Sequence, residues 1–330
     1  MSVKYLCSIH SLLITLLLPL QVSSSWALTN IKPAEQTLTA SRYGNLSGTV
    51  DDVNILFVRG LPDPIRKEVS LAISENFNTL QVQQIDATEF NSTTYHWPDV
   101  DIIVAAGSPG CEVALKADVS TRTLCTLLTK ESFFALNETK QTDSSRRIEA
   151  LVIDQPVSRQ ALVASSVYPA LNLFTGFHTT GTQGQRTVTS GDRLESIPFK
   201  PNTALSTQLR EAIKKRDALV ATSDSRIFNT STLSTVLLTA YGFGKPVIGF
   251  SRAYVKAGAL ITCYSTPSMI MQQVAENIAS GDFRDTSNAT LVYPKFFAIL
   301  DNPSVARSLS LIKAFRFTAE RAYQDMDFAL

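Results

Sequence analysis

Short apolar runs alternate with helical patterns along most of the chain. The runs Val53–Val58 and Asp101–Ala106 are typical, and each leads into a segment that contains glycine. Between these two runs, Ile65, Val69 and Ile73 recur at the spacing of one helix face. Strands that alternate with helices indicate a parallel sheet covered by helices. The pattern therefore predicts an α/β fold.

A polar, charged stretch at Asn137–Arg147 interrupts this alternation. A new series of strand and helix patterns starts at Ile148–Ile153 and has a size similar to that of the first. A chain of 330 residues is long enough for two lobes, each with its own hydrophobic core. We therefore predict two related α/β lobes, each built on a parallel sheet.

Small polar residues follow several of the predicted strands. In an open α/β sheet, ligands bind beyond the carboxyl ends of the strands, so these residues are the candidate ligand contacts. In the first series they are Gly107, Ser108 and Pro109 after one strand, and Thr129 and Lys130 after the next. In the second series they are His178, Asp224, Ser225, Ser251 and Tyr254.

Most of these candidates also have an ordinary structural explanation. The turn that contains Ser108 presents backbone N–H groups suited to a carboxylate, but a plain turn between strand and helix has the same sequence. Asp224 could accept hydrogen bonds from a ligand ammonium or hydroxyl, or it could act as a helix cap or turn residue. Lys130 could meet a ligand carboxylate or remain solvated. Tyr254 could stack on a ligand ring or belong to the core.

Motifs for catalysis, cofactors and metals are missing from the sequence. Gly107-Ser108-Pro109-Gly110 does not match the GxSxG of hydrolases, and neither GxxxxGK[ST] nor GxGxxG after the first strand occurs. No cluster of Cys and His has the spacing of a zinc site. The net charge of +1 gives no electrostatic reason to expect nucleic acid. We therefore predict a protein that is not an enzyme and needs no cofactor or metal.

The first 27 residues have the features of a signal peptide. Lys4 supplies a positive charge, Leu12–Leu20 form an apolar stretch, and Ser25 and Ala27 are small residues near a cleavage point. An uncleaved membrane anchor is the alternative, but a spanning helix needs about 20 apolar residues. Residues 28–52 then form a polar leader. The mature protein is expected to be exported and soluble.

Three cysteines remain after removal of the signal peptide, namely Cys111, Cys125 and Cys263. An odd number argues against a disulfide framework. Cys111 and Cys125 could pair in an oxidising compartment, but their apolar neighbours favour a role as small core residues.

Four segments together resemble a known family of proteins. They are DIIVAAGSPG at 101–110, ALVIDQPVSRQ at 150–160, KPVIGFSRAYVKAGALITCYSTP at 245–267 and NPSVARSLSL at 302–311. Through them the chain is similar, over roughly Val53–Leu311, to the periplasmic substrate-binding proteins of ABC transporters. The resemblance is strongest to the branch whose better-known members bind tryptophan and related amino acids. Thr129-Lys130-Glu131 replaces an Asp-Pro pair common in the family, and Arg147–Leu151 replaces a glycine-rich stretch, so this chain resembles a divergent branch.

The resemblance implies a type I periplasmic-binding-protein fold, in which two doubly wound parallel-sheet lobes are joined by hinge strands. A ligand would lie between the lobes, with the Ser108 loop on one side and Asp224, Ser225 and Ser251 on the other. The chain would cross near Ile153, Ile261 and Gly281. The implied division gives residues 53–152 and about 262–285 to lobe I, and 153–261 and about 286–330 to lobe II.

The function implied by this resemblance is solute capture in the periplasm. The small-molecule solute, amino-acid-like or aromatic, would pass to an ABC-type permease in the inner membrane. The alternative is a sensory module that presents its closed state to a signalling protein or an outer-membrane receptor.

Overall fold

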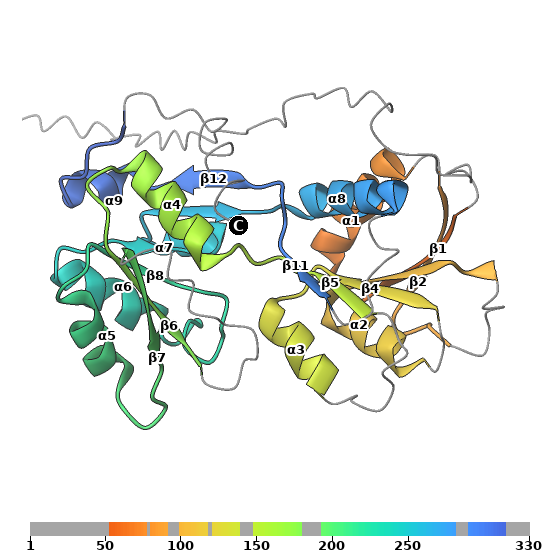
Figure 1. Ribbon diagram of the computed structural model, residues 1–330, viewed down its shortest axis with the longest axis horizontal. Coiled ribbons are helices and arrows are strands. Elements are labelled where there is room, and N and C mark those ends of the chain that lie inside the picture. The colour runs from red at the N-terminus through yellow and green to blue at the C-terminus, as the bar shows by residue number, and fades with distance from the viewer. Residues whose placement is uncertain are drawn as a thin grey trace, which may run out of the picture.

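The computed structural model describes residues 53–77, 80–91, 99–117, 121–138, 148–179, 193–281 and 290–314. The expected signal peptide at 1–27 and the leader at 28–52 lie outside these residues. The described residues form two six-stranded sheets, one in each of two lobes. Figure 1 shows the lobes side by side along the long axis of the molecule. The predicted architecture, two α/β lobes with parallel sheets, is confirmed.

The first lobe is built on a parallel sheet with the strand order β11-β5-β4-β3-β1-β2. Its strands are β1 (Asn54–Arg59), β2 (Gln81–Asp86), β3 (Ile102–Ala106), β4 (Arg122–Thr126), β5 (Ile148–Leu151) and β11 (Thr290–Val292). Its helices are α1 (Asp63–Asn76), α2 (Gly107–Lys116), α3 (Lys130–Glu138) and α8 (Pro267–Ser280). Helices α1 and α8 cover one face of the sheet, and α2 and α3 cover the other (Figure 1). Burial on both faces explains why β3 is apolar throughout.

The second lobe has the strand order β12-β10-β9-β8-β6-β7, and only β12 is antiparallel to its neighbour. Its strands are β6 (Phe174–His178), β7 (Leu194–Pro198), β8 (Ala218–Val220), β9 (Val247–Ile248), β10 (Ile261–Tyr264) and β12 (Ala298–Asp301). Its helices are α4 (Val157–Val167), α5 (Leu205–Ile213), α6 (Leu233–Gly242), α7 (Arg252–Ala257) and α9 (Pro303–Ser308). No helix of the described residues is long and apolar enough to cross a membrane.

In the described residues the chain passes between the lobes three times, after β5, after β10 and after β11. Two of these crossings differ from the expected positions. Ile261 starts β10, which is buried and paired within the second sheet, so the chain crosses only after Tyr264. Beyond Gly281, β11 still pairs with β5 in the first sheet, so the last crossing follows Val292. Residues 262–264 therefore belong to lobe II, and residues 290–292 belong to lobe I.

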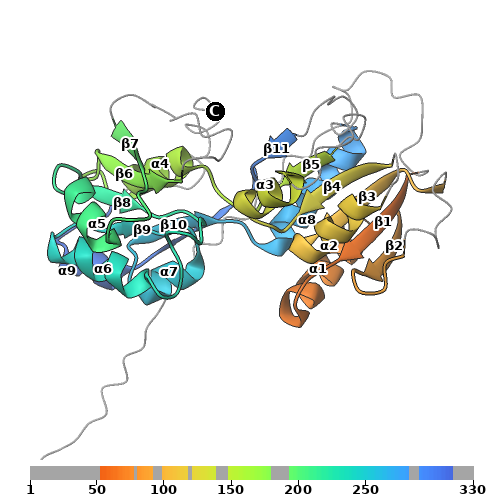
Figure 2. The same cartoon turned by 90° about the horizontal axis from the view of Figure 1, so that it is seen from below.

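Hydrogen bonds tie the three crossing segments to one another. The backbone N–H of Val152 donates to the carbonyl of Val292 at 3.1 Å. The Gln155 amide donates to Ser265 Oγ at 2.8 Å, and that hydroxyl donates to the carbonyl of Phe296 at 2.5 Å. Figure 2 shows the result as a narrow waist between the lobes.

The glycines of the Gly107–Gly110 turn are required by close backbone packing. A Cβ on Gly60 would lie 2.2 Å from the backbone nitrogen of Gly110, and a Cβ on Gly107 would lie 2.4 Å from the carbonyl oxygen of Gly60. Gly107 also has a φ of +76°, which other residues rarely adopt. This turn therefore holds β1 against the start of α2.

A disulfide joins Cys111 on α2 to Cys125 on β4, with a Cα–Cα distance of 5.4 Å. The packing of α2 over β3 and β4 brings the two thiols together, which the sequence could not show. The expectation that both are only small core residues is therefore wrong, although both are fully buried. Cys263 is free and buried.

Replacing Gly60 by Ala should lower the free energy of unfolding by about 1–3 kcal/mol, because the backbone of Gly110 cannot move away without disturbing β1. Urea unfolding followed by circular dichroism measures the loss. Gly242→Ala is the matched control, since a Cβ at Gly242 meets no atom within 4 Å. Equal stability of the two variants would contradict the packing argument.

Replacing Cys111 and Cys125 together by Ala should lower the free energy of unfolding by about 3 kcal/mol, because the disulfide closes a loop with a sequence separation of 14. Dithiothreitol should lower the melting temperature of the wild-type protein and leave that of the double variant unchanged. A wild-type melting temperature that is insensitive to the reductant, with reduction verified by thiol titration, would show that the disulfide adds no stability.

Candidate functional site

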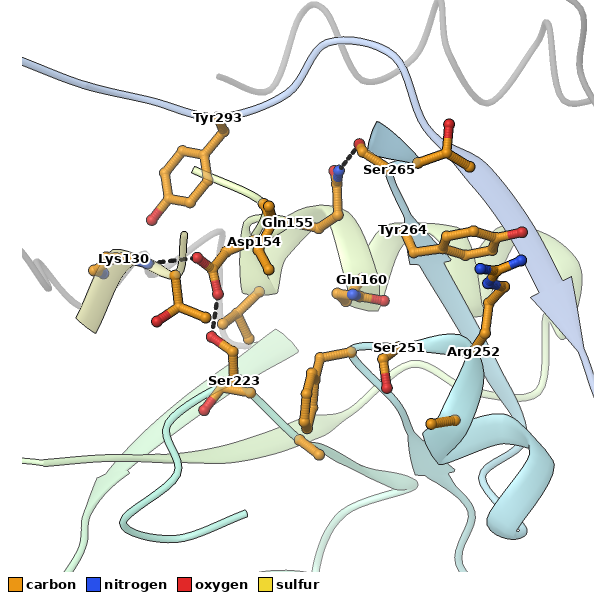
Figure 3. A pocket seen from close by; sticks show the side chains of 18 of the residues that line it. Lys130, Asp154, Gln155, Gln160, Ser223, Ser251, Arg252, Tyr264, Ser265 and Tyr293 are labelled. Atoms are coloured by element: carbon orange, nitrogen blue, oxygen red, sulfur yellow. Dashed lines mark hydrogen bonds between the residues drawn. The ribbon is translucent and has the colours of Figure 1, made fainter. Parts of the chain in front are cut away.

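A cavity of about 670 Å³ lies between the lobes beside the crossing segments (Figure 3). This volume falls in the range of small-molecule sites, about 300–1,000 Å³. The first lobe contributes Ile65, Thr129, Lys130, Glu131, Thr266, Pro267 and Tyr293 to its walls. The second lobe contributes Val157, Gln160, Ala221, Thr222, Ser223, Phe250, Ser251, Arg252, Ala253, Lys256 and Tyr264. Ile153, Asp154, Gln155 and Ser265 come from the crossing segments. We call this cavity the interlobe cleft.

Two carboxylates of the interlobe cleft meet a hydroxyl from the opposite lobe. Asp154 accepts a hydrogen bond from the backbone N–H of Lys130 at 2.6 Å. The hydroxyl of Ser223 is hydrogen-bonded to Asp154 and lies 3.2 Å from Oε2 of Glu131. Since Ser223 follows β8 in the second lobe and Glu131 lies on α3 in the first, the contact between them bridges the lobes. Figure 3 shows Asp154 hydrogen-bonded to both Lys130 and Ser223.

Burial raises the pKa values of both carboxylates, Glu131 and Asp154. It is the largest cause of the raised pKa of Asp154. Burial first, and then the charge of Asp154, raise the pKa of Glu131 as well. Burial and these two charges together raise the pKa of Tyr293 to about 12. Among the described residues, no lysine or arginine forms an ion pair with Glu131 or Asp154.

Aromatic rings and one guanidinium form the wall near α7. The guanidinium of Arg252 lies over the ring of Tyr264, 5.4 Å from its centroid. The ring of Phe250 packs against Tyr254 with the centroids 4.9 Å apart. Ser251 caps α7, and its side chain accepts a hydrogen bond from the backbone N–H of Tyr254. This part of the interlobe cleft can therefore contact an apolar or planar group.

The start of α4 is a fixed part of the wall. The side-chain amide of Gln160 donates to the carbonyl of Cys263 and accepts from its backbone N–H, both at 3.0 Å. The guanidinium of Arg159 donates to Gln155 Oε1 at 2.6 Å and to the carbonyl of Pro294. These groups are used by the fold, so they hold the crossing segments and are not free for a ligand.

Three of the residues proposed from the sequence line the interlobe cleft: Thr129, Lys130 and Ser251. Thr129 precedes α3, and its hydroxyl accepts a hydrogen bond from the backbone N–H of Ser132 in the first turn of that helix. Lys130 and Glu131 lie in the same turn. The strand-end rule located these three because β4 and β9 both end at the interlobe cleft.

The other proposed residues are not among those that line the interlobe cleft. Gly107, Ser108 and Pro109 form the first turn of α2, packed near Gly60. His178 lies at the end of β6, where Nδ1 is 2.7 Å from Ser196 Oγ. Ser225 is exposed to solvent. Tyr254 is buried in the core of the second lobe, and burial raises its pKa to about 12.

Asp224 is held within its own turn and does not line the interlobe cleft. Its carboxylate accepts two hydrogen bonds from the guanidinium of Arg226, both 2.8 Å, and one from Thr179 Oγ1 at 2.9 Å. Burial by itself raises the pKa of Asp224, but these hydrogen bonds outweigh burial and the net pKa is lowered. Of the two roles that the sequence allowed for Asp224, ligand contact or turn residue, the structure shows the hydrogen bonds of a turn residue.

Sequence reasoning missed Glu131, Asp154, Ser223 and Tyr293. Asp154 follows the apolar run Ile148–Ile153, so the strand-end rule could have selected it. Ser223 stands beside Asp224 after the strand at Ala218, so the same rule could have selected it. Tyr293 follows β11, a strand of three residues that is too short to recognise from its pattern.

No protein-family model and no curated protein matches the chain. Among solved structures, a ligand-free, open substrate-binding protein with adhesive properties from Clostridium difficile, CD0873, matches with a TM-score of 0.54 and 14% identity. The match covers 80% of this chain and 96% of that one. An ABC domain in complex with L-Trp from Streptococcus pneumonia matches with a TM-score of 0.46 and 14% identity, covering 79% and 95%. The chain therefore has the two-lobe fold of type I periplasmic-binding-protein-like proteins, as predicted.

Replacing Asp224 by Asn should lower the free energy of unfolding by about 1.5–3 kcal/mol at neutral pH, because hydrogen bonds to a charged group are lost. A carboxylate whose pKa is lowered on folding stabilises the folded state above its ordinary pKa of 3.8, and this stabilisation is lost as the pH falls. The difference from wild type should therefore shrink on acidification. Urea unfolding at neutral and acid pH measures it.

Glu211→Gln is the control for this measurement, because it removes an exposed carboxylate that forms a surface ion pair with Lys214. It should cost less than about 1 kcal/mol at either pH. A loss at Asp224→Asn that persists unchanged in acid would contradict the charged hydrogen bonds as its cause.

Proposed function

We propose that this chain is an exported solute-binding protein that closes its lobes on a small molecule and delivers it to an ABC-type permease. The observation that carries the proposal is an interlobe cleft whose walls come from both lobes and from the segments between them. A ligand that contacts both lobes favours the closed arrangement, because it gains contacts there that the open arrangement lacks.

The chemistry of the interlobe cleft favours binding over catalysis. Its lining residues include no histidine or cysteine among the described residues, and their polar side chains are hydroxyls, amides, carboxylates and exposed cations. A small number of polar groups set among aromatic and aliphatic side chains is typical of a ligand pocket. We infer that the protein is a receptor for a solute.

The disulfide supports a place outside the cytoplasm. Buried disulfides such as Cys111–Cys125 form and persist in oxidising compartments, including the bacterial periplasm. This agrees with the signal peptide predicted for residues 1–27, and together they support periplasmic localisation.

The test is a thermal-shift screen of amino acids, peptides, sugars and nucleobases. A solute at about one hundred times its Kd should stabilise the protein by about 2.7 kcal/mol. Ser223→Trp should abolish this stabilisation, because the indole would fill the interlobe cleft between the two lobes. Ser234→Trp, on the exposed side of α6, should keep it.

If both Ser223→Trp and Ser234→Trp lose the thermal stabilisation by the solute, or if neither loses it, the solute-binding site lies outside the interlobe cleft. If no solute stabilises the wild-type protein, the solute-binding function fails. A pull-down with the closed, ligand-bound protein tests delivery: recovery of permease subunits supports it, and recovery of a signalling protein supports the sensory alternative.

A further inference from the structure

Two carboxylates of the interlobe cleft, Glu131 and Asp154, form no ion pair with a lysine or arginine of the described residues. Glu131 and Asp154 face the same hydroxyl of Ser223, and both are half-buried. Partial burial makes a carboxylate without a paired cation costly, and carboxylates with pKa values shifted in this way cluster at functional sites. Here two of them converge inside a cavity large enough for a ligand.

The nearest groups from every neighbouring element leave this charge largely unbalanced. Asp154 adds its negative charge to that of Glu131, and Asp224 contributes in the same direction from the second lobe. Lys130 offsets part of it through its charge, but its ammonium forms no ion pair with either carboxylate. Tyr293 stays a neutral phenol at physiological pH. This end of the pocket therefore presents carboxylate, hydroxyl and phenol oxygens, and among the described residues no lysine or arginine forms an ion pair with its carboxylates.

The other cations of the interlobe cleft are placed differently. Arg252 and Lys256 lie on α7 and are exposed to solvent. The guanidinium of Arg252 already lies over the ring of Tyr264. Figure 3 places Arg252 on the opposite side of the pocket from Asp154. These groups therefore do not neutralise the carboxylates and do not form a desolvated site for a ligand anion.

We propose that the interlobe cleft selects an organic cation, whose protonated amine lies between Glu131 and Asp154 and takes the place of the Ser223 hydroxyl. This assignment rests on the proposed solute-binding function and names the class of its ligand. An ammonium group has three donors and a full charge, so it satisfies two carboxylates that one hydroxyl proton cannot. The phenol ring of Tyr293 borders the same end of the pocket and can face the cation.

Binding of such a ligand has a defined dependence on pH. The carboxylates must be ionised to hold the ammonium, and their raised pKa values leave them partly protonated in mild acid. The amine itself stays protonated up to a pH of about 10. Affinity should therefore rise as the pH increases from acid to neutral, over a range displaced upward from that of an ordinary carboxylate, and then level off.

The experiment uses pairs of probes that share a scaffold and differ in charge. Tryptamine is compared with indole-3-propionate, and cadaverine with glutarate, by thermal shift and calorimetry on the full mature protein; L-tryptophan is the zwitterionic probe. At least one amine should bind saturably and about tenfold or more tightly than its carboxylate partner. Equal or tighter binding of a carboxylate, or binding of the zwitterion without the amine, overturns the cation assignment.

The assignment and the proposed function fail in different ways. If neutral or anionic solutes bind and no amine does, the cation assignment is wrong and the solute-binding function stands. If no solute of the wider screen binds, the function fails and the assignment fails with it.

Variants locate the amine at the two carboxylates. Glu131→Gln and Asp154→Asn should each weaken amine binding by about 10–100-fold and flatten its rise with pH. Glu211→Gln, an exposed carboxylate on α5, should change neither. Circular dichroism and melting temperature establish that each variant is folded. Asp154 accepts a hydrogen bond from the backbone N–H of Lys130, whereas Glu131 accepts one from the Ser223 hydroxyl, so Glu131→Gln serves if Asp154→Asn does not fold. Unchanged amine affinity in a folded Glu131→Gln protein overturns the proposal.

Discussion

The three crossing segments and the hydrogen bonds between them are the constraint on which the rest of the molecule depends. Gln155 and Ser265 join two segments, and the hydroxyl of Ser265 continues to the carbonyl of Phe296 in the third. These hydrogen bonds join the three segments into one connection between the lobes. The waist leaves rotation of one lobe relative to the other as the motion available. The interlobe cleft lies beside this waist, where such a rotation changes its width most directly.

The same waist explains the unusual electrostatics of the interlobe cleft. Asp154 lies in the crossing segment that follows β5, and it accepts a hydrogen bond from the backbone N–H of Lys130. The start of α3 places Glu131 nearby, and the turn after β8 brings Ser223 from the other lobe. Each group is positioned by the backbone of its own segment, and together the three form a half-buried cluster of oxygen atoms. Its energetic cost is offset by the packing of two large cores.

Candidates that looked alike in the sequence have different roles in the structure. Ser108 and Lys130 both follow a parallel strand, but only Lys130 lies at the interlobe cleft. The turn at Ser108 is occupied by backbone packing of Gly60 against Gly110, which leaves no room for a ligand between them. Asp224 carries a charge and follows a strand, yet its hydrogen bonds close on Arg226 and Thr179. Strand ends indicate the correct edge of the sheet, and tertiary packing decides which of them remains open.

The sequence by itself determined most of the local elements, the division into two α/β lobes and the helix starts at Thr266-Pro267 and Asn302-Pro303, because periodicity and capping act over a few residues. Only the tertiary structure decided the pairing of Cys111 with Cys125 and the place of β11 in the first sheet. The tertiary structure also decided which residues line the interlobe cleft. All three features depend on contacts between segments that are far apart in the chain. The spacing of residues within one segment carries no information about such contacts.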